Sequence, residues 1–190
     1  MTIERESQVI FWQRQDMPGM ERLTLTVSDD ALIAVSTVIC VENGGFRLDH
    51  RWTLSRDWRT RSVEVEKWSA DGHSRLALER AGSSWKVDGM RRPDLDEADE
   101  PDLSVTPFCN TLPIQRMMRE KLESFTLDTC YIDAATMRIA RSFQKYEWVA
   151  PNHLRYIDLG LSIGFEADLK IDDTGLVVSY QNLFERVAAR

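Results

Sequence analysis

The segment Gly160-Leu161-Ser162-Ile163-Gly164 has the G-x-S-x-G spacing of a nucleophile elbow. In α/β-hydrolases the serine of that motif sits between a strand and a helix, and an acid and a histidine follow later in the chain. Here the residues after the motif alternate like a strand, and no histidine occurs after His153. We therefore interpret the motif as a glycine-flanked turn and not as a catalytic serine.

A cysteine beside an asparagine, Cys109-Asn110, is the second candidate for chemistry, because a cysteine can be activated by a histidine that is close only in space. Nothing near it in the sequence supports such a pair. With Cys40 and Cys130 the chain has three cysteines and no CxxC pair, which argues against both a disulfide framework and a cysteine-rich zinc site. We expect free, mostly buried thiols and no catalytic residue.

Metal, cofactor and nucleic-acid sites are not indicated. The three histidines are widely separated, and the acidic segment 94–102 lacks the glycine and the closing glutamate of an EF-hand loop. Glycine-rich phosphate loops are absent as well. The net charge is −7 and the 24 basic residues are scattered, whereas a nucleic-acid surface needs a concentrated positive field. We expect no metal, no cofactor and no nucleic-acid partner.

The elements that must position any site are mostly strands. Residues 23–27, 62–66 and 165–171 alternate between apolar and polar side chains, which is the period of a strand with one buried face. The turn pairs Asn43-Gly44 and Asp71-Gly72 join such segments. Strands joined by tight turns are antiparallel. The pattern predicts a mostly β protein, a strongly curved antiparallel meander that forms an open or half-closed barrel.

We expect one domain over residues 1–190, with strand-rich halves at about 6–88 and 124–180. Between them, residues 91–102 are polar and acidic and are predicted to form a loop. A short central helix is predicted at about 112–122, where apolar residues recur at helical spacing. Thr111 is expected to cap this helix, and Pro113 to lie in its first turn.

A second short helix is predicted at the C-terminus, because Leu183, Phe184 and Val187 repeat the helical spacing. No apolar run approaches the roughly 20 residues that span a bilayer. Glu4 and Glu6 stand where a secretory signal would be basic and then apolar, so we expect a cytoplasmic protein. The oligomeric state is left open.

Several blocks of the chain are similar to a known family. They are residues 56–63, 85–89, 102–114, 165–178 and 180–187. The most specific is D-L-x-x-T-P-F-x-N-T-L-P-I, which begins at Asp102. On these blocks the chain resembles the bacterial putative glycolipid-binding family. That resemblance implies an open, strongly curved antiparallel barrel like that of the lipoprotein carriers of the bacterial envelope, with lipid on the concave face and helical material near the mouth.

The chain departs from the family pattern at a few positions. Gln115-Arg116 stands where the family usually has two arginines, Cys109 where threonine is common, and Gln181 where proline is common. The loss of one arginine weakens the case for a paired cationic site that holds an anionic head group.

The resemblance and the curved sheet together predict a non-enzymatic protein that binds a lipid or glycolipid-like amphiphile. A concave sheet lined with Trp, Leu and Met would bury an acyl chain, each methylene contributing about 0.8 kcal/mol, while polar groups at the rim orient the head. The candidate rim residues are Arg59, Asp102, Thr106, Asn110 and Arg116, and the candidate wall residues are Trp85 and Tyr146. Each has a structural alternative. Thr106 and Asn110, for example, could be used on backbone hydrogen bonds in the loop.

Two other functions remain open. An enzyme acting on a lipid or a sugar-linked acyl group would show titratable groups with shifted pKa values converging in the cavity. A protein-interaction scaffold would show an exposed apolar patch in place of a deep pocket.

Overall fold

The computed structural model describes residues 6–189. Residues 1–5, which carry part of the argument for a cytoplasmic location, lie outside the described residues. The strands are β1 (Glu6–Arg14), β2 (Gly19–Val27), β3 (Leu32–Cys40), β4 (Phe46–Leu54), β5 (Thr60–Ser69), β6 (Gly72–Ala81), β7 (Ser84–Val87), β8 (Met90–Arg91), β9 (Glu100–Leu103), β10 (Ser124–Asp133), β11 (Arg138–Ala150), β12 (His153–Asp158), β13 (Glu166–Ile171), β14 (Val177–Tyr180) and β15 (Phe184–Ala189). Helix α1 spans Phe108–Glu120, and two 3-10 turns are η1 (Glu42–Gly44) and η2 (Pro93–Leu95).

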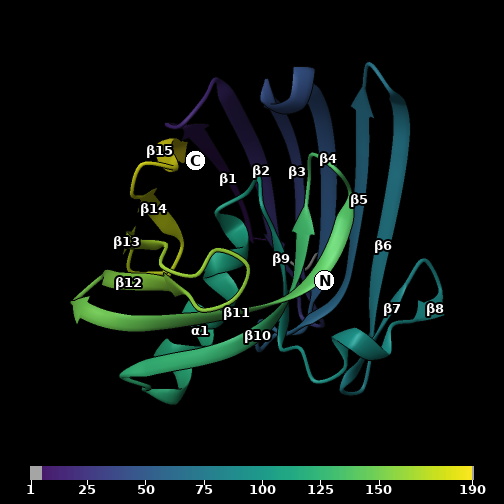
Figure 1. The fold of residues 1–190 in the computed structure, drawn as a ribbon. Coiled ribbons are helices and arrows are strands. Elements are labelled where there is room, and N and C mark those ends of the chain that lie inside the picture. Colours follow the sequence, from purple (N-terminus) through teal and green to yellow (C-terminus); the bar gives the residue numbers. More distant parts are fainter. Residues whose placement is uncertain (1–5, 190) are drawn as a thin grey trace, which may run out of the picture.

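All of these strands belong to one curved sheet (Figure 1). Its order runs from β8 back to β1, continues with β15, and then runs back from β14 to β9. Each pair of neighbours is antiparallel except β9 and β10, which are parallel because α1 lies between them in the chain and supplies the crossover. The predicted mostly β, curved meander is confirmed. Sequence reasoning missed β9, which lies at the end of the segment predicted to be a loop.

The sheet curls without closing into a barrel. Its edges are β8 and β9, and side chains bridge part of the gap between β9 and the β5–β6 region. Glu100 Oε2 accepts the backbone N–H of Thr60 at 3.0 Å, and Glu100 Oε1 lies 3.3 Å from Arg80 Nη2. The prediction of an open or half-closed barrel is therefore confirmed.

Helix α1 begins four residues earlier than predicted, with Pro107 at its N-cap, and Thr111 does not cap it. Thr106 Oγ1 accepts the N–H of Phe108 at 3.1 Å, while Thr111 is buried inside the helix. Pro113 also lies inside the helix, where it lacks the N–H that would bond the preceding turn. The helix ends at Glu120, and Lys121 follows with a φ of 54°.

The predicted C-terminal helix is wrong. Residues 184–189 form β15, which pairs with β1 in a register that places Phe184 opposite Arg14. Asn182, with a φ of 62°, belongs to the turn that leads into this strand. Pairing with a strand from the other end of the chain overrides the local helical spacing, and it joins the two halves of the sheet.

The helix lies within the curve of the sheet, between the β1–β5 wall and strands β10–β13 (Figure 1). Phe108 packs edge-on against Trp52, with ring centroids 5.8 Å apart. Leu112, Ile114 and Met117 are also buried. The concave face that sequence reasoning assigned to an acyl chain is thus largely filled by the protein's own helix. Within residues 6–189 no helix has the length and apolar character needed to cross a membrane.

Candidate ligand-binding site

A cavity of about 230 Å³ remains beside the start of α1. It is open on one side and is lined by the end of β9, the start of α1, strands β10 and β12, the loop after β12, β14 and the start of β15. Its lining residues are Asp102, Leu103, Ser104, Thr106, Asn110, Tyr131, Tyr156, Asp158, Ser162, Phe165, Tyr180, Leu183 and Phe184. We call it the tyrosine cavity. It is slightly smaller than the roughly 300–1,000 Å³ of typical ligand pockets, so its volume suits a head group better than a whole amphiphile.

Aromatic rings make one wall of the tyrosine cavity. Tyr156 lies 6.0 Å from Phe165 and 5.8 Å from Tyr180, and Tyr180 lies 6.3 Å from Phe184, all measured between ring centroids. Burial raises the pKa values of Tyr156 and Tyr180 well above the ordinary range, and it raises that of Tyr131 to about 12. These hydroxyls therefore stay protonated at neutral pH and can donate hydrogen bonds.

Two carboxylates face the same space. Asp158 holds the loop after β12, because its Oδ1 accepts the N–H groups of Gly160 at 2.8 Å and Ser162 at 3.0 Å. Its Oδ2 lies 3.3 Å from the Tyr156 hydroxyl. Asp102 accepts a hydrogen bond from the Gln144 amide. Burial raises the pKa of Asp102, and the charge of Asp158 adds to this effect.

The G-x-S-x-G segment is a turn, as interpreted from the sequence. It lies between β12 and β13, so a strand follows it where the hydrolase motif needs a helix, and among the described residues no histidine lines the tyrosine cavity. Gly160 is required by packing, since a Cβ there would lie 2.5 Å from the backbone nitrogen of Phe143. The motif thus shapes the loop at the cavity and carries no catalytic triad.

Thr106 and Asn110 both line the tyrosine cavity and both use their polar atoms within the protein. Thr106 Oγ1 donates to Glu21 Oε1 at 2.9 Å and accepts the backbone N–H of Phe108 at 3.1 Å. The Asn110 amide donates to the Pro107 carbonyl at 3.3 Å, and its Oδ1 accepts the Tyr146 hydroxyl at 2.8 Å. Thr106 and Asn110 therefore line a cavity and also bond to the backbone, the two roles that the sequence analysis gave as alternatives.

Glu21 anchors a buried polar network behind Thr106. Its Oε1 also accepts Ser36 Oγ at 2.7 Å and lies 3.0 Å from His50 Nε2. The Trp52 indole N–H donates to His50 Nδ1 at 2.9 Å, so Nε2 is the ring nitrogen that carries the proton toward Glu21. This network fixes the β9–α1 corner to the opposite wall of the sheet.

Cys109 is buried in the same corner and is not a nucleophile. Its sulfur lies 3.1 Å from the Thr106 carbonyl and 3.3 Å from the Leu103 carbonyl. Burial raises the pKa of the thiol far above the ordinary value, so no thiolate forms at neutral pH. All three cysteines are free and buried, as predicted.

A second, more polar cavity of about 340 Å³ lies near the β5–β9 gap. We call it the arginine cavity. Its lining residues are Arg59, Arg80, Gly82, Ser83, Glu97, Ala98, Asp99, Glu100 and Arg116. Three arginines face three carboxylates, so the formal charges cancel.

Two of these arginines are firmly held. Arg80 packs 4.3 Å above the Trp85 ring and pairs with Glu100, while Arg116 pairs with Asp99 at 3.0 Å and packs 4.4 Å above the Phe125 ring. These contacts are those of a structural ion-pair cluster.

A family model described as "Putative glycolipid-binding" matches residues 9–186. The chain belongs to this family. It is also similar to the crystal structure of a DUF1089 family protein from Pseudomonas aeruginosa, with 29% sequence identity and a TM-score of 0.78. The match covers 89% of this chain and 92% of that one. A comparison with curated protein sequences finds no match.

The structure separates the residues predicted from the glycolipid-binding family's motifs. Asp102, Thr106 and Asn110 line the tyrosine cavity, whereas Arg59 and Arg116 line the arginine cavity. The family's second arginine is replaced here by Gln115, whose amide donates to the Thr174 carbonyl on the β13–β14 turn. Arg116 therefore has no cationic neighbour at position 115.

The two predicted wall residues lie behind the cavities. Tyr146 does not line the tyrosine cavity, but its hydroxyl donates to Asn110 and its ring lies 5.4 Å from that of Tyr156, and both of these residues do line it. Trp85 is fully buried, and its indole N–H donates to the Ala98 carbonyl at 3.0 Å. Both side chains support residues that line a cavity.

Sequence reasoning missed most of the C-terminal half of the site. On β12, Leu154, Tyr156 and Asp158 share the buried face, and on β11 Ser142 and Gln144 do so. The sequence did contain a signal for these residues, namely polar side chains at strand positions whose neighbours two residues away are apolar and face the core. Such polar groups are buried only when they are hydrogen-bonded or functional. Within the described residues, no group of three or more His, Cys, Asp or Glu side chains could hold a metal ion.

Proposed function

We propose that the protein binds a lipid or glycolipid-like amphiphile without chemical change. The head group occupies the tyrosine cavity, and the apolar chain runs along the loop that borders it. Membership of the glycolipid-binding family supports this proposal.

The observation that carries the proposal is the run of exposed apolar side chains beside a cavity that holds two carboxyl groups. Ser162 and Phe165 line the cavity, and between and beside them Leu161 is 54% exposed and Ile163 is 80% exposed. No residue from 159 to 165 is charged. An exposed apolar loop is costly unless it contacts an apolar partner, and a cavity that continues into such a loop matches a molecule with a polar head and an apolar chain.

The position of α1 determines where the chain of the amphiphile lies. Because Phe108, Leu112 and Ile114 already pack inside the curve of the sheet, an acyl chain has no room there without displacing the helix. The loop after β12 offers apolar surface without that cost.

Native mass spectrometry of the protein purified under gentle desalting tests the proposal. We expect a co-purifying amphiphile, or a one-to-one complex after addition of lipids and glycolipids to stripped protein. Ile163→Ser should weaken this complex, because it removes apolar contact at the mouth. Ile39→Ser is the matched control, since Ile39 is also exposed but lies on β3. Absence of any complex, or equal weakening by both variants, contradicts the proposal.

A second function is favoured by one observation, the raised pKa of Asp102 in a cavity that also holds Asp158. A carboxyl whose pKa is raised by burial holds its proton to a higher pH than an ordinary aspartate, which favours general acid catalysis. An enzyme acting on a sugar-linked or acyl bond would turn over nitrophenyl glycosides or esters and would lose that activity in Asp102→Asn. If the wild-type protein turns over these compounds no faster than Asp102→Asn does, they are not its substrates.

A further inference from the structure

The charged side chains that line the tyrosine cavity are all acidic. Its lining contains Asp102 and Asp158 and no lysine, arginine or histidine. Neither carboxylate has an ion-pair partner within residues 6–189, although many other acidic side chains there do, including Asp99, Asp128 and Asp168. A buried carboxylate without a cation is electrostatically costly, so the cavity is complementary to a positive charge.

The Tyr180 side chain gives a second, independent observation about the tyrosine cavity. It is 92% buried and lines the cavity, since only 8% of it is exposed. Among the described residues its hydroxyl has no hydrogen-bond partner, whereas the Tyr146 hydroxyl donates to Asn110 and Gln144 and the Tyr156 hydroxyl to Asp158. The ring is thus held by the protein while its hydroxyl makes no bond within it, so this side chain contributes mainly an aromatic face to the cavity.

The rings of Tyr131, Tyr156, Phe165, Tyr180 and Phe184 complete the surroundings. Aromatic faces attract cations through the ring quadrupole, and cages of such rings bind quaternary ammonium groups. Phe184 already has one cation, since the Arg14 guanidinium lies 5.7 Å from its centroid.

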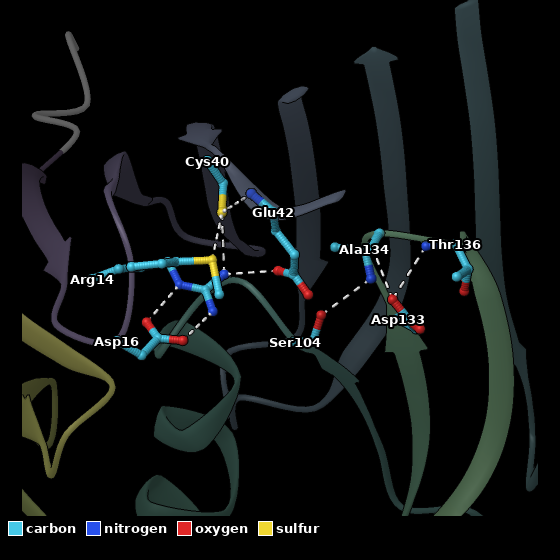
Figure 2. Close-up of polar contacts among 10 residues, drawn as sticks. Arg14, Asp16, Cys40, Glu42, Ser104, Asp133, Ala134 and Thr136 are labelled. Carbon is cyan, nitrogen blue, oxygen red and sulfur yellow. Dashed lines mark hydrogen bonds and ion pairs between the residues drawn. The ribbon is translucent and has the colours of Figure 1, made fainter. Parts of the chain in front are cut away.

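That guanidinium is committed to other partners. Figure 2 shows Arg14 between the carboxylates of Asp16, at 2.6 Å, and Glu42, at 3.0 Å, with the Cys40 sulfur beside it. Arg14 does not line the tyrosine cavity. It therefore leaves the charge inside the cavity unbalanced.

We propose that the head group bound in the tyrosine cavity carries an ammonium group, either a quaternary ammonium or a protonated amine. The ammonium lies against the aromatic wall and is balanced by Asp102 and Asp158. This inference rests on the proposed amphiphile binding, which it narrows to one class of head group. A neutral sugar lacks the charge that the carboxylates would balance, and an anionic head group would be repelled by both.

The pKa of Asp102 is raised by burial and by the charge of Asp158, and no neighbouring cation offsets these effects. Asp102 is faced by Cys109 from α1, Gln144 from β11 and Asp158 from β12, and none of these side chains is a cation. A bound ammonium would lower the pKa of Asp102, so binding should release protons when the pH is near that pKa.

Three amphiphiles with the same dodecyl chain test the inference by isothermal titration below their micelle concentrations. They are dodecyltrimethylammonium, dodecyl maltoside and dodecyl sulfate. We expect the ammonium compound to bind at least about tenfold more tightly than the other two, as expected for a desolvated cation–π site. Equal or tighter binding of the maltoside or the sulfate overturns the inference and leaves the proposed amphiphile binding intact.

Tetramethylammonium is the head group without the alkyl chain. Its binding tests the ammonium site separately from the proposed binding of an amphiphile. If no dodecyl compound binds but tetramethylammonium shifts the NMR signals of Tyr156 and Tyr180, the amphiphile proposal fails and the ammonium site stands. If neither tetramethylammonium nor the dodecyl ammonium compound binds, the ammonium site is overturned.

Variants locate the site. Asp102→Asn should weaken dodecyltrimethylammonium about tenfold. Asp71→Asn, in the exposed β5–β6 hairpin, changes the net charge of the protein equally and should have no effect. Tyr180→Phe keeps the ring and should retain binding, whereas Tyr180→Leu should lose it. If the two aspartate variants lose affinity equally, or Tyr180→Leu binds as wild type, the ammonium is not in this cavity.

Discussion

The inner face of the sheet has a tryptophan side and a tyrosine side, and they differ in what their polar atoms do. On the tryptophan side the indole N–H groups of Trp12 and Trp85 donate to the carbonyls of Val177 and Ala98, and the rings pack in a closed core. On the tyrosine side the rings of Tyr156 and Tyr180 border a cavity that also contains two carboxylates.

This difference shows how one curved sheet can be both core and site. An indole N–H that is satisfied within the protein leaves the ring free to fill space, and Phe108 of the helix packs directly against the Trp52 ring. A tyrosine hydroxyl and an inward aspartate resist such packing, because burial without partners is costly. We therefore assign stability to the tryptophan side and ligand binding to the tyrosine side.

The largest expected effect is on the tryptophan side. Trp52→Ala should lower the free energy of unfolding by about 3–5 kcal/mol, because it opens a cavity against Phe108 and removes the donor to His50. Trp68→Ala is the control at a more exposed tryptophan, where the cost should be much smaller. Urea denaturation measures both. If both variants lose a similar free energy of unfolding, the packing of α1 against Trp52 contributes little to the stability of the tryptophan side.

An intermediate effect, of opposite sign, is expected on the tyrosine side. Burial holds the pKa of Asp102 above its ordinary value of 3.8, so the unfolded chain releases this proton at a lower pH than the folded protein does. The penalty is absent below about pH 3.8, grows as the pH rises toward the folded-state pKa, and remains at neutral pH. Asp102→Asn should therefore raise the melting temperature at pH 7.

The rise in melting temperature caused by Asp102→Asn should become smaller as the pH is lowered toward 4, and it should be absent below pH 4. Thermal melts of both proteins at a series of pH values measure it. A variant that is less stable than wild type at pH 7 would show that Asp102 is held by contacts that outweigh its desolvation.

The smallest effect on stability is expected for Tyr156→Phe. The hydroxyl lies 3.3 Å from Asp158 Oδ2, a long hydrogen bond, so its loss should cost at most about 1 kcal/mol. The ring remains, and binding of an ammonium head group should persist. A loss of several kcal/mol in denaturation would place Tyr156 with the structural tryptophans and weaken the distinction between the two sides.

Local patterns in the sequence were sufficient to predict most of the strands. Alternation over residues 62–66 and 165–171, and a turn at Asp71-Gly72, depend on neighbours in the chain, and the structure confirms them. The C-terminal helix was mispredicted because the spacing of Leu183, Phe184 and Val187 fits a helix locally, whereas pairing with β1 depends on residues at the other end of the chain.

The candidate site was predictable only in part. The block beginning at Asp102 identified the β9–α1 corner, but three-dimensional curvature decides that Arg59 and Arg116 face a different cavity. Asp158 carried a readable signal, an acidic residue in phase with Leu154 and Tyr156 on a strand. No local pattern indicated that α1 would fill the concave face.

The most direct test of the account is NMR mapping of a dodecyl amphiphile added to the labelled protein. The account predicts that the largest chemical-shift changes occur at Asn110, Tyr156, Ser162 and Tyr180, around the tyrosine cavity. Changes centred on Arg59 and Arg116, or no saturable changes at all, would contradict it.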